Sequence, residues 1–470
     1  MSSVCAAGAR SKCLSTRFTS GLRLCSLILS ALFTFTLIRT ADVVSAAASP
    51  LAQPKSTRQV GLPLAATRAA IPADNLPTPE KVALGQRLFF DARLSADGTI
   101  ACSTCHDPAR AFTDGKAVST GIGGRPGRRN APTILNALYN ATQFWDGRAA
   151  TLEQQAAFPI VNSVEMGQPS LDAAVARIAA IPEYRRAFQN VFGAAPDGDN
   201  LLRAIAAYER SQVSFDSPFD RYTAGERNAI GAAAQRGWEL FNSRAQCNKC
   251  HALSETKRDT TNFTDNDFHN IGVMIVRHDV VRLAKQAREL LTSGDAAAID
   301  RAAIQTDMSA LGRFLVTKKE SDIAAFKTPN LRNLLLTAPY FHDGSHATLW
   351  DVIDHYNKGA GLHNPYLDAD IEPLALSERD IDDLVALLAS LTSPAYREAA
   401  AIELARQREL SRTTRPQRDT VRAFGPKPMR PKPAVTARHG ARVREHAIAP
   451  GHDRYAREAG AGARYAGAAE

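Results

Sequence analysis

Cysteine is scarce in this chain of 470 residues, which contains seven. Three of the seven lie within the first 25 residues, and the other four form two pairs with the spacing Cys-x-x-Cys: Cys102 with Cys105 and Cys247 with Cys250. If the first segment is removed on export, no cysteine is left for a structural disulfide outside these two pairs. The pairs must therefore be explained by their own chemistry.

The apolar run near the N-terminus is too short to cross a membrane. It covers residues 24–38, fewer than the roughly 20 residues that a spanning helix needs. Basic residues precede the run, and small residues follow it at 45–48. This order predicts a secretory signal peptide over residues 1–47, rather than a membrane anchor. We therefore expect a periplasmic protein with no integral membrane span after cleavage.

Most of the chain is nearly neutral, although the net charge of the whole chain is +9. Residues 412–470 contain eleven Arg and two Lys against five acidic residues, a balance of +8. This stretch has no apolar periodicity and cannot bury enough surface to fold, so it predicts a basic disordered tail. The alternative is an arm that steers an acidic partner. Nucleic acid is not an expected partner of an exported chain.

Two segments of the sequence look like copies of each other. In each, a Gly, a Leu and a Phe at helical spacing precede Cys-x-x-Cys-His, as at Gly85 and Gly237. The length also favours two domains. We expect a linker over residues 48–75, followed by cytochrome c-like domains over 76–225 and 226–411.

Convincing alternating strand patterns are also missing. Helical periodicity instead covers residues 170–181, 200–212, 348–356 and 377–391. The predicted fold class is mainly α, with two tandem cytochrome c-like domains that each carry one covalently bound haem c.

The motif Cys-x-x-Cys-His is the strongest chemical signal. Two thiols at this spacing add to both vinyl groups of one haem, and the adjacent histidine supplies an axial nitrogen to the iron. One copy could be a redox dithiol, and a zinc site would need closing ligands at short spacing that neither copy has. Two copies predict two haem c groups. The attaching cysteines and proximal histidines are Cys102, Cys105 and His106 for the first haem, and Cys247, Cys250 and His251 for the second.

A distal ligand for the first haem is not apparent. The interval between His106 and His251 contains no other histidine, and its only methionine is Met166. A haem with an open sixth position can bind peroxide, whereas a haem closed on both sides mainly transfers electrons. The first haem is therefore the expected catalytic centre.

Four further motifs occur in order along the chain. They are Arg-Asn-Ala-Pro-Thr at 129–133, Phe-Trp-Asp-Gly-Arg-Ala at 144–149, residues 162–166, and Pro-Tyr-Phe-His-Asp-Gly at 339–344. With these motifs the chain resembles the bacterial diheme cytochrome c peroxidase and MauG superfamily over roughly residues 76–393. The resemblance implies a peroxidatic haem in the first domain and an electron-transfer haem in the second.

The resemblance also implies roles for four residues of the first domain. Trp145 stands at the family's position between the haems, where it would relay electrons. Gln155 and Glu165 match the distal polar pair of the peroxide-binding haem, and Pro159 falls in the same pocket. Heterolytic cleavage of the O–O bond needs a proton moved from the inner to the outer oxygen, and Glu165 is the expected acid and base.

Three residues match the family's calcium site between the domains, namely Asn130, Thr337 and Pro339. A side-chain oxygen and backbone carbonyls suit this hard cation. We therefore expect one Ca²⁺ in addition to the two haems.

Tyr356 is the predicted distal ligand of the second haem. Family peroxidases place a methionine fourteen residues after the motif histidine, here His342, where this chain has Tyr356 and MauG also has tyrosine. Neighbouring His355 is a competitor, but adjacent helix positions differ by roughly 100° in direction. Met274 and Met308 are further competitors, and neither occupies the family position.

The chain departs from the peroxidase pattern in other places too. The loop over residues 107–129 lacks the histidine found in peroxidases that must be reduced before they work. Residues 278–322 read as an inserted pair of helices. The missing histidine and Tyr356 both shift the expectation toward MauG.

The leading functional prediction is a periplasmic peroxidase that reduces hydrogen peroxide to water with electrons from a small cytochrome c or cupredoxin. The first alternative is a MauG-like enzyme that oxidises residues of a partner protein. The second is a non-catalytic diheme electron carrier, which would have two six-coordinate haems. The sequence makes no prediction about the oligomeric state.

Overall fold

The computed structural model describes most of the chain, in two units, 1–415 and 416–470. The described residues are 47–55, 71–252, 262–273, 279–292, 298, 301–302, 306–360 and 364–423. The second unit is described only as far as Ala423, so most of the predicted tail lies outside this set, as does the predicted signal peptide before residue 47. None of the helices in the described ranges is long and apolar enough to span a membrane.

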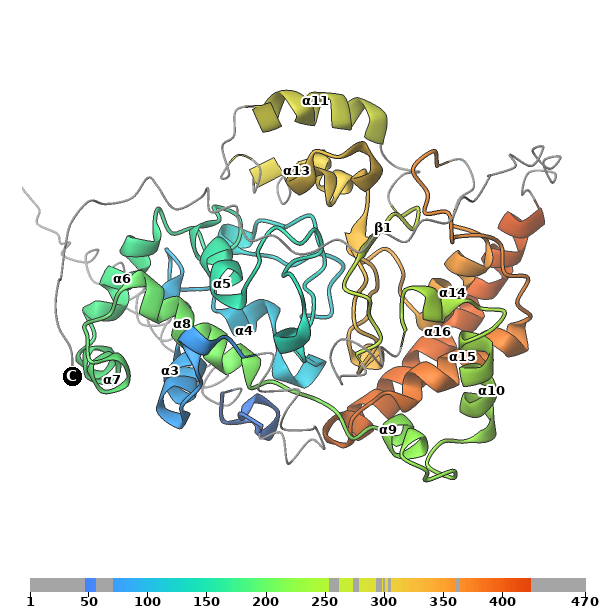
Figure 1. The fold of residues 1–470 in the computed structure, drawn as a ribbon, viewed down its shortest axis with the longest axis horizontal. Coiled ribbons are helices and arrows are strands. Elements are labelled where there is room, and N and C mark those ends of the chain that lie inside the picture. Colours follow the sequence, from blue (N-terminus) through green and yellow to red (C-terminus); the bar gives the residue numbers. More distant parts are fainter. Residues whose placement is uncertain are drawn as a thin grey trace, which may run out of the picture. The chain divides into compact units, whose positions relative to one another are not determined.

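The structure is mainly helical, as predicted (Figure 1). The helices of the first half are α3 (Pro79–Phe89), α4 (Cys102–Cys105), α5 (Leu152–Val161), α6 (Leu171–Ala179), α7 (Pro182–Phe192), α8 (Gly198–Arg210) and α9 (Pro218–Thr223). Side-chain caps begin several of them. The hydroxyl of Thr78 accepts the Lys81 N–H at the start of α3, and Asp197 accepts the Asn200 N–H at the start of α8.

The second half is also built from helices, joined by a very small sheet. Its helices are α10 (Ala232–Phe241), α11 (Val280–Thr292), α13 (Phe314–Thr317), α14 (Leu349–Asn357), α15 (Glu378–Ser390) and α16 (Arg397–Ala423). Strands β1 (Phe268–His269) and β2 (Phe326–Lys327) pair antiparallel, with Phe268 opposite Lys327. These strands could not be predicted, because two residues are too few to show an alternating pattern.

The same helix crossing occurs in both halves and explains the two glycines that precede the Cys-x-x-Cys-His motifs. Helix α3 packs on α8, and α10 packs on α15. A Cβ atom on Gly85 would lie 1.8 Å from the carbonyl oxygen of Ala204, and one on Gly237 would lie 2.1 Å from that of Asp383. Only glycine permits these backbones to approach so closely. The two sequence copies thus correspond to two copies of one packing arrangement.

Each half has its own apolar core. Leu88, Phe89 and Tyr208 belong to the first, and Phe241 and Leu384 belong to the second. The inserted segment has a third core, which joins one face of α11 to the segment around α13. Its buried residues include Leu283, Ala287, Leu311 and Phe314. Of the two helices predicted within 278–322, the structure describes α11, while residues 293–297, 299–300 and 303–305 lie outside the described set.

Two predicted boundaries are wrong. The linker predicted over 48–75 includes residues that belong to the first core, since Ala52 is fully buried and its carbonyl oxygen accepts hydrogen bonds from Gln86 and Tyr208. The tail predicted from residue 412 begins later, because α16 continues to Ala423. Helix α16 is anchored at Gln407, whose Oε1 accepts the Leu349 N–H at 3.0 Å.

Candidate active site

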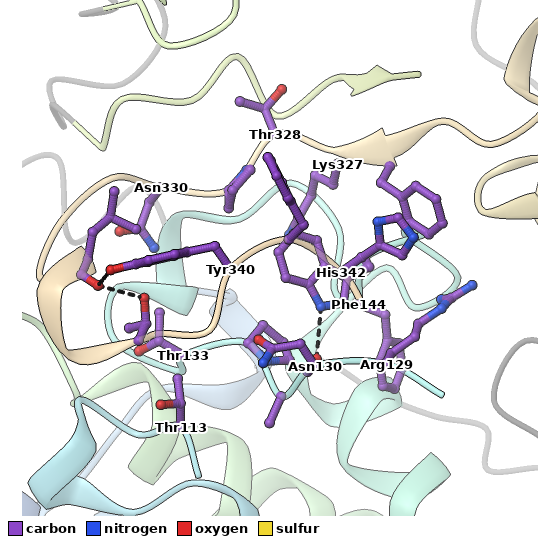
Figure 2. Close-up of a pocket in the computed structure, with 18 of the residues that line it drawn as sticks. Thr113, Arg129, Asn130, Thr133, Phe144, Lys327, Thr328, Asn330, Tyr340 and His342 are labelled. Atoms are coloured by element: carbon purple, nitrogen blue, oxygen red, sulfur yellow. Dashed lines mark hydrogen bonds between the residues drawn. The ribbon is translucent and has the colours of Figure 1, made fainter. Parts of the chain in front are cut away.

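One cavity brings together every residue that the sequence assigned to a site. It is lined by the six residues of the two Cys-x-x-Cys-His motifs and by the eight other predicted residues. Those eight are Asn130, Trp145, Gln155, Pro159, Glu165, Thr337, Pro339 and Tyr356. Figure 2 shows part of this cavity, with Asn130, Phe144, Lys327 and His342 around it. Residues as far apart in the sequence as Cys102 and Tyr356 therefore share one site.

The two proximal histidines are oriented in the same way. His106 Nδ1 lies 3.0 Å from the carbonyl oxygen of Phe112, and His251 Nδ1 lies 2.7 Å from that of Phe263. A carbonyl can only accept, so each Nδ1 carries the proton and each Nε2 is left as the free ligand nitrogen. Burial lowers the pKa of both imidazoles, which keeps them neutral as iron ligands must be. Both motifs therefore fit haem attachment.

The thiols of the motifs are poor candidates for a redox dithiol. Burial raises the pKa of Cys105 to about 11 and that of Cys247 to about 12, and it raises the pKa of Cys102 as well. Redox-active dithiols instead have a lowered pKa, because the thiolate is the reactive form. The environment of these three cysteines thus disfavours the dithiol alternative.

The predicted distal residues of the first haem come from α5 and the turn that follows it. Gln155 and Pro159 lie on α5, and Glu165 lies one turn beyond its end. The side-chain oxygen of Asn162 accepts the Glu165 N–H at 3.3 Å, which fixes this turn. Met166, the only methionine between the two proximal histidines, is 2 % exposed and belongs to the first apolar core.

Trp145 is held in place by three partners from different parts of the chain. Its indole Nε1 donates to the carbonyl oxygen of Asn130 at 2.9 Å, and its own carbonyl accepts the Lys327 N–H at 2.8 Å. The edge of its ring faces His342, with the ring centres 6.4 Å apart. His342 in turn stacks on Phe326 at 3.5 Å. Trp145 therefore has a defined orientation at the cavity wall.

A buried ion cluster next to Trp145 was not recognised in the sequence. Asp146 is fully buried and lies 2.7 Å from Arg129 and 3.1 Å from Arg148. Burial alone would raise the pKa of Asp146, but Arg148 and Arg129 together outweigh it and lower the pKa to about 2. Arg313, from the inserted segment, donates to the carbonyl oxygen of Asp146 at 3.0 Å. The insert thus supports the loop that carries Trp145.

Two other buried ionisable residues at the cavity were also missed. Lys327 is 9 % exposed, and its Nζ donates to the carbonyl oxygen of Thr142 at 2.6 Å. Burial lowers the pKa of Lys327 to about 8 in spite of the nearby Asp146. Glu209 on α8 is 4 % exposed. No local sequence pattern marks either residue, because their burial is set by distant packing.

The three residues of the predicted calcium site all line the cavity. Asn130 Nδ2 donates to the carbonyl oxygen of Lys116 at 2.8 Å, which orients the side-chain oxygen away from that carbonyl. Pro339 forms a cis peptide bond with Ala338, and Thr337 directly precedes this pair. The donors are neutral oxygens, which calcium accepts, so the residues fit this cation without supplying charge.

Tyr356 lies on α14 and lines the cavity together with Cys247, Cys250 and His251. Its side chain is partly buried, and its hydroxyl forms no hydrogen bond with any residue that the structure describes. Burial raises the pKa of Tyr356 well above its ordinary value. Its position at the cavity is compatible with the predicted role as the distal ligand of the second haem.

Two competitors of Tyr356, His355 and Met308, are placed less favourably. His355 Nε2 lies 2.7 Å from the carbonyl oxygen of Ile271, and the residue does not line the cavity. Met308 packs against the core of the insert. Met274 lies outside the described residues.

Comparisons with known proteins agree with this geometry. Residues 79–228 match the family model for di-haem cytochrome c peroxidase. The chain is 39 % identical to the methylamine utilization protein MauG of Methylorubrum extorquens, over 71 % of this chain and 83 % of that protein. It is 37 % identical to the cytochrome-c peroxidase IdrP1 of Denitromonas iodatirespirans, over 68 % of this chain and 84 % of that protein.

Solved structures show the same relationship. A MauG-like protein associated with microbial copper homeostasis is 33 % identical, with a TM-score of 0.57, over 69 % of this chain and 92 % of that one. The fold and the paired haem-attachment motifs define a c-type diheme oxidoreductase. The chain belongs to the diheme cytochrome c peroxidase and MauG superfamily, and it is a peroxidase-like enzyme. Since the relatives include both peroxidases and MauG, they do not distinguish these two activities.

Proposed function

We propose that this protein is a periplasmic diheme peroxidase that reduces hydrogen peroxide to water at its first haem, with electrons that enter through the second. The observation that carries this proposal is the single cavity lined by both attachment motifs and by Glu165, with no histidine between His106 and His251 to close the first iron. The signal peptide predicted over residues 1–47 is the basis for the periplasmic location.

Different residues of the chain would bind the two haems and the calcium ion. The four motif cysteines attach the two haems, and His106 and His251 are the proximal ligands. The ammonium of Lys327 provides buried positive charge at the cavity, suited to a haem propionate. Asn130, Thr337 and Pro339 would hold one Ca²⁺. When bound, the first haem supplies the site where peroxide is reduced.

The side chains on the distal side of the first haem would carry out the proton transfers. Reduction of one hydrogen peroxide to two waters consumes two protons and two electrons. Glu165 would take the proton from the inner oxygen and return it to the outer oxygen, which then leaves as water. Gln155 and Pro159 shape the same pocket, and Gln155 can donate a hydrogen bond without changing its charge.

Electrons would come from a small cytochrome c or cupredoxin and pass from the second haem to the first by way of Trp145. This role of Trp145 is supported by its fixed orientation at the cavity wall. The non-catalytic carrier is the weaker alternative, because it needs a sixth ligand for the first haem.

A MauG-like function is the second candidate, and Tyr356 is the observation that favours it. An anionic oxygen ligand would stabilise the higher oxidation states of the second haem and favour sharing of oxidising equivalents between the haems. The enzyme would then oxidise side chains of a partner protein rather than accept electrons from a small carrier.

Steady-state kinetics separate these functions. The proposed peroxidase consumes hydrogen peroxide and oxidises two equivalents of reduced cytochrome c for each peroxide. Cys247→Ala with Cys250→Ala should keep the first haem but abolish turnover with the cytochrome. A wild-type protein that reacts with peroxide without oxidising any small donor would contradict the peroxidase and favour the MauG-like reaction.

A further inference from the structure

Glu209 is a buried acid that the mechanism above does not use. It lies near the end of α8, is 4 % exposed, and lines the cavity, where it interacts electrostatically with Cys102. Its Oε2 is completely buried and forms no hydrogen bond with any residue in the described part of the chain. A buried, ionised carboxylate without a partner is strongly disfavoured, so this side chain requires an explanation.

The cation next to Glu209 in sequence does not neutralise it. Both terminal nitrogens of the Arg210 guanidinium donate to the carboxylate of Glu153 on α5, with Nη2 to Oε2 at 2.7 Å. Glu153 also accepts a hydrogen bond from Asn75. Arg210 therefore already has its counter-charge, and Glu209 is left as the extra acid of this group.

The surroundings of Glu209 keep it protonated. Burial raises its pKa to about 8; Arg210 acts against this shift, and Glu153 adds to it. The other titratable groups that interact with Glu209 are the phenol of Tyr208 and the thiol of Cys102. The thiol becomes an uncharged thioether when the first haem is attached, so it adds no charge in the loaded protein.

We propose that Glu209 is a redox-linked proton site of the first haem, holding a proton while the iron is reduced and releasing it into the cavity when the iron is oxidised. This inference rests on the proposed function, because it assumes a haem that changes its oxidation state in this half of the cavity. Added positive charge on the iron stabilises a nearby carboxylate, and the low dielectric of a buried site strengthens the effect.

The proposed site can be placed in the proton balance of peroxide reduction. Reoxidation of the reduced haem would be accompanied by release of one proton from the Glu209 carboxylic acid, which becomes a carboxylate. Over a complete cycle Glu209 loses and regains this proton, so both protons that reduce one hydrogen peroxide to two waters come from solvent. When electrons from the donor reduce the haem again, Glu209 takes up one proton from solvent.

The coupling is reciprocal, so it is measurable without turnover. In the wild-type protein loaded with both haems, the midpoint potential of the first haem should fall as the pH rises around neutrality. The limiting slope is a tenfold change in the ferric–ferrous equilibrium constant per pH unit, about 59 mV for one electron. Glu209→Gln should remove most of this slope, because the amide cannot release a proton.

Two further variants control the experiment. Glu209→Asp keeps an acid at the position and should retain a pH-dependent potential. Glu80→Gln changes an exposed carboxylate on α3 and should leave the slope as in the wild type. The infrared difference spectrum between the oxidised and reduced protein provides a second readout, in which the carbonyl band of a protonated carboxylic acid should be absent from Glu209→Gln.

The inference would be overturned if Glu209→Gln kept both haems and the full wild-type slope, or if its infrared band remained unchanged. Failure of the proposed function would look different. A wild-type protein that turned over no peroxide but lost its potential slope in Glu209→Gln would refute the peroxidase while supporting the proton linkage.

Discussion

Asp146→Asn tests whether the buried ion cluster holds the loop that carries Trp145. The pKa of Asp146 falls from 3.8 to about 2, and one pKa unit corresponds to about 1.4 kcal/mol, so ionised Asp146 stabilises the folded protein by roughly 2 kcal/mol at neutral pH. Removing one partner of a buried ion pair typically costs about 3–5 kcal/mol, since the remaining charge is left buried. We therefore expect Asp146→Asn to lower the free energy of unfolding by about 2–5 kcal/mol.

The assay is urea unfolding of the haem-loaded protein at pH 7, followed by far-ultraviolet circular dichroism. Because the folded-state pKa is lowered, the stabilisation is complete above the unfolded-state value of 3.8 and is lost as the pH falls toward 2. The difference between wild type and variant should therefore shrink over that range. Asp307→Asn is the matched control, because Asp307 pairs with Arg128 at 3.1 Å but is 55 % exposed, and it should cost at most about 1 kcal/mol. Equal unfolding midpoints for Asp146→Asn and wild type would refute the reasoning.

Three further predictions concern the haem sites themselves. Cys102→Ala with Cys105→Ala should leave one covalent haem per chain, measured by haem staining on a denaturing gel; an unchanged stain would contradict the first attachment site. Glu165→Gln should keep both haems but slow the reaction with peroxide by about 10²- to 10⁴-fold in stopped-flow absorbance, because an amide cannot accept and return the proton. An unchanged rate would leave Glu165 with a structural role only. Tyr356→Phe should change the low-spin ferric signal of the second haem in electron paramagnetic resonance and spare the signal of the first, and an unaltered low-spin signal would exclude Tyr356 as the ligand.

The haem-attachment residues could be predicted because their chemistry is local in sequence. Covalent attachment needs two cysteines and a histidine within five positions, so the motif can be recognised without knowledge of the fold. The repeated glycines could also be recognised as a pattern, but the sequence alone does not explain why glycine is needed at these positions. Only the structure shows that Gly85 and Gly237 each allow two helix backbones to touch.

The residues that sequence reasoning missed depend on contacts between distant segments. Asp146 appeared only as part of a motif, since its carboxylate is balanced by the more distant Arg129 and its backbone carbonyl accepts a hydrogen bond from Arg313 of the insert. From their neighbours in sequence alone, Glu209 and Lys327 would be predicted to lie at the surface, as most charged residues do. The wrong boundaries have the same origin, because the burial of Ala52 is decided by α3 and α8 rather than by its own neighbours in sequence.

The most direct test of the account is the electron paramagnetic resonance spectrum of the resting, fully oxidised protein before and after hydrogen peroxide is added. The account predicts one high-spin ferric haem and one low-spin ferric haem, with the high-spin signal lost on addition of peroxide and no prior reduction needed. This follows from the absence of a histidine between His106 and His251 that could close the first iron. Two low-spin haems at rest, or a reaction with peroxide only after partial reduction, would contradict it.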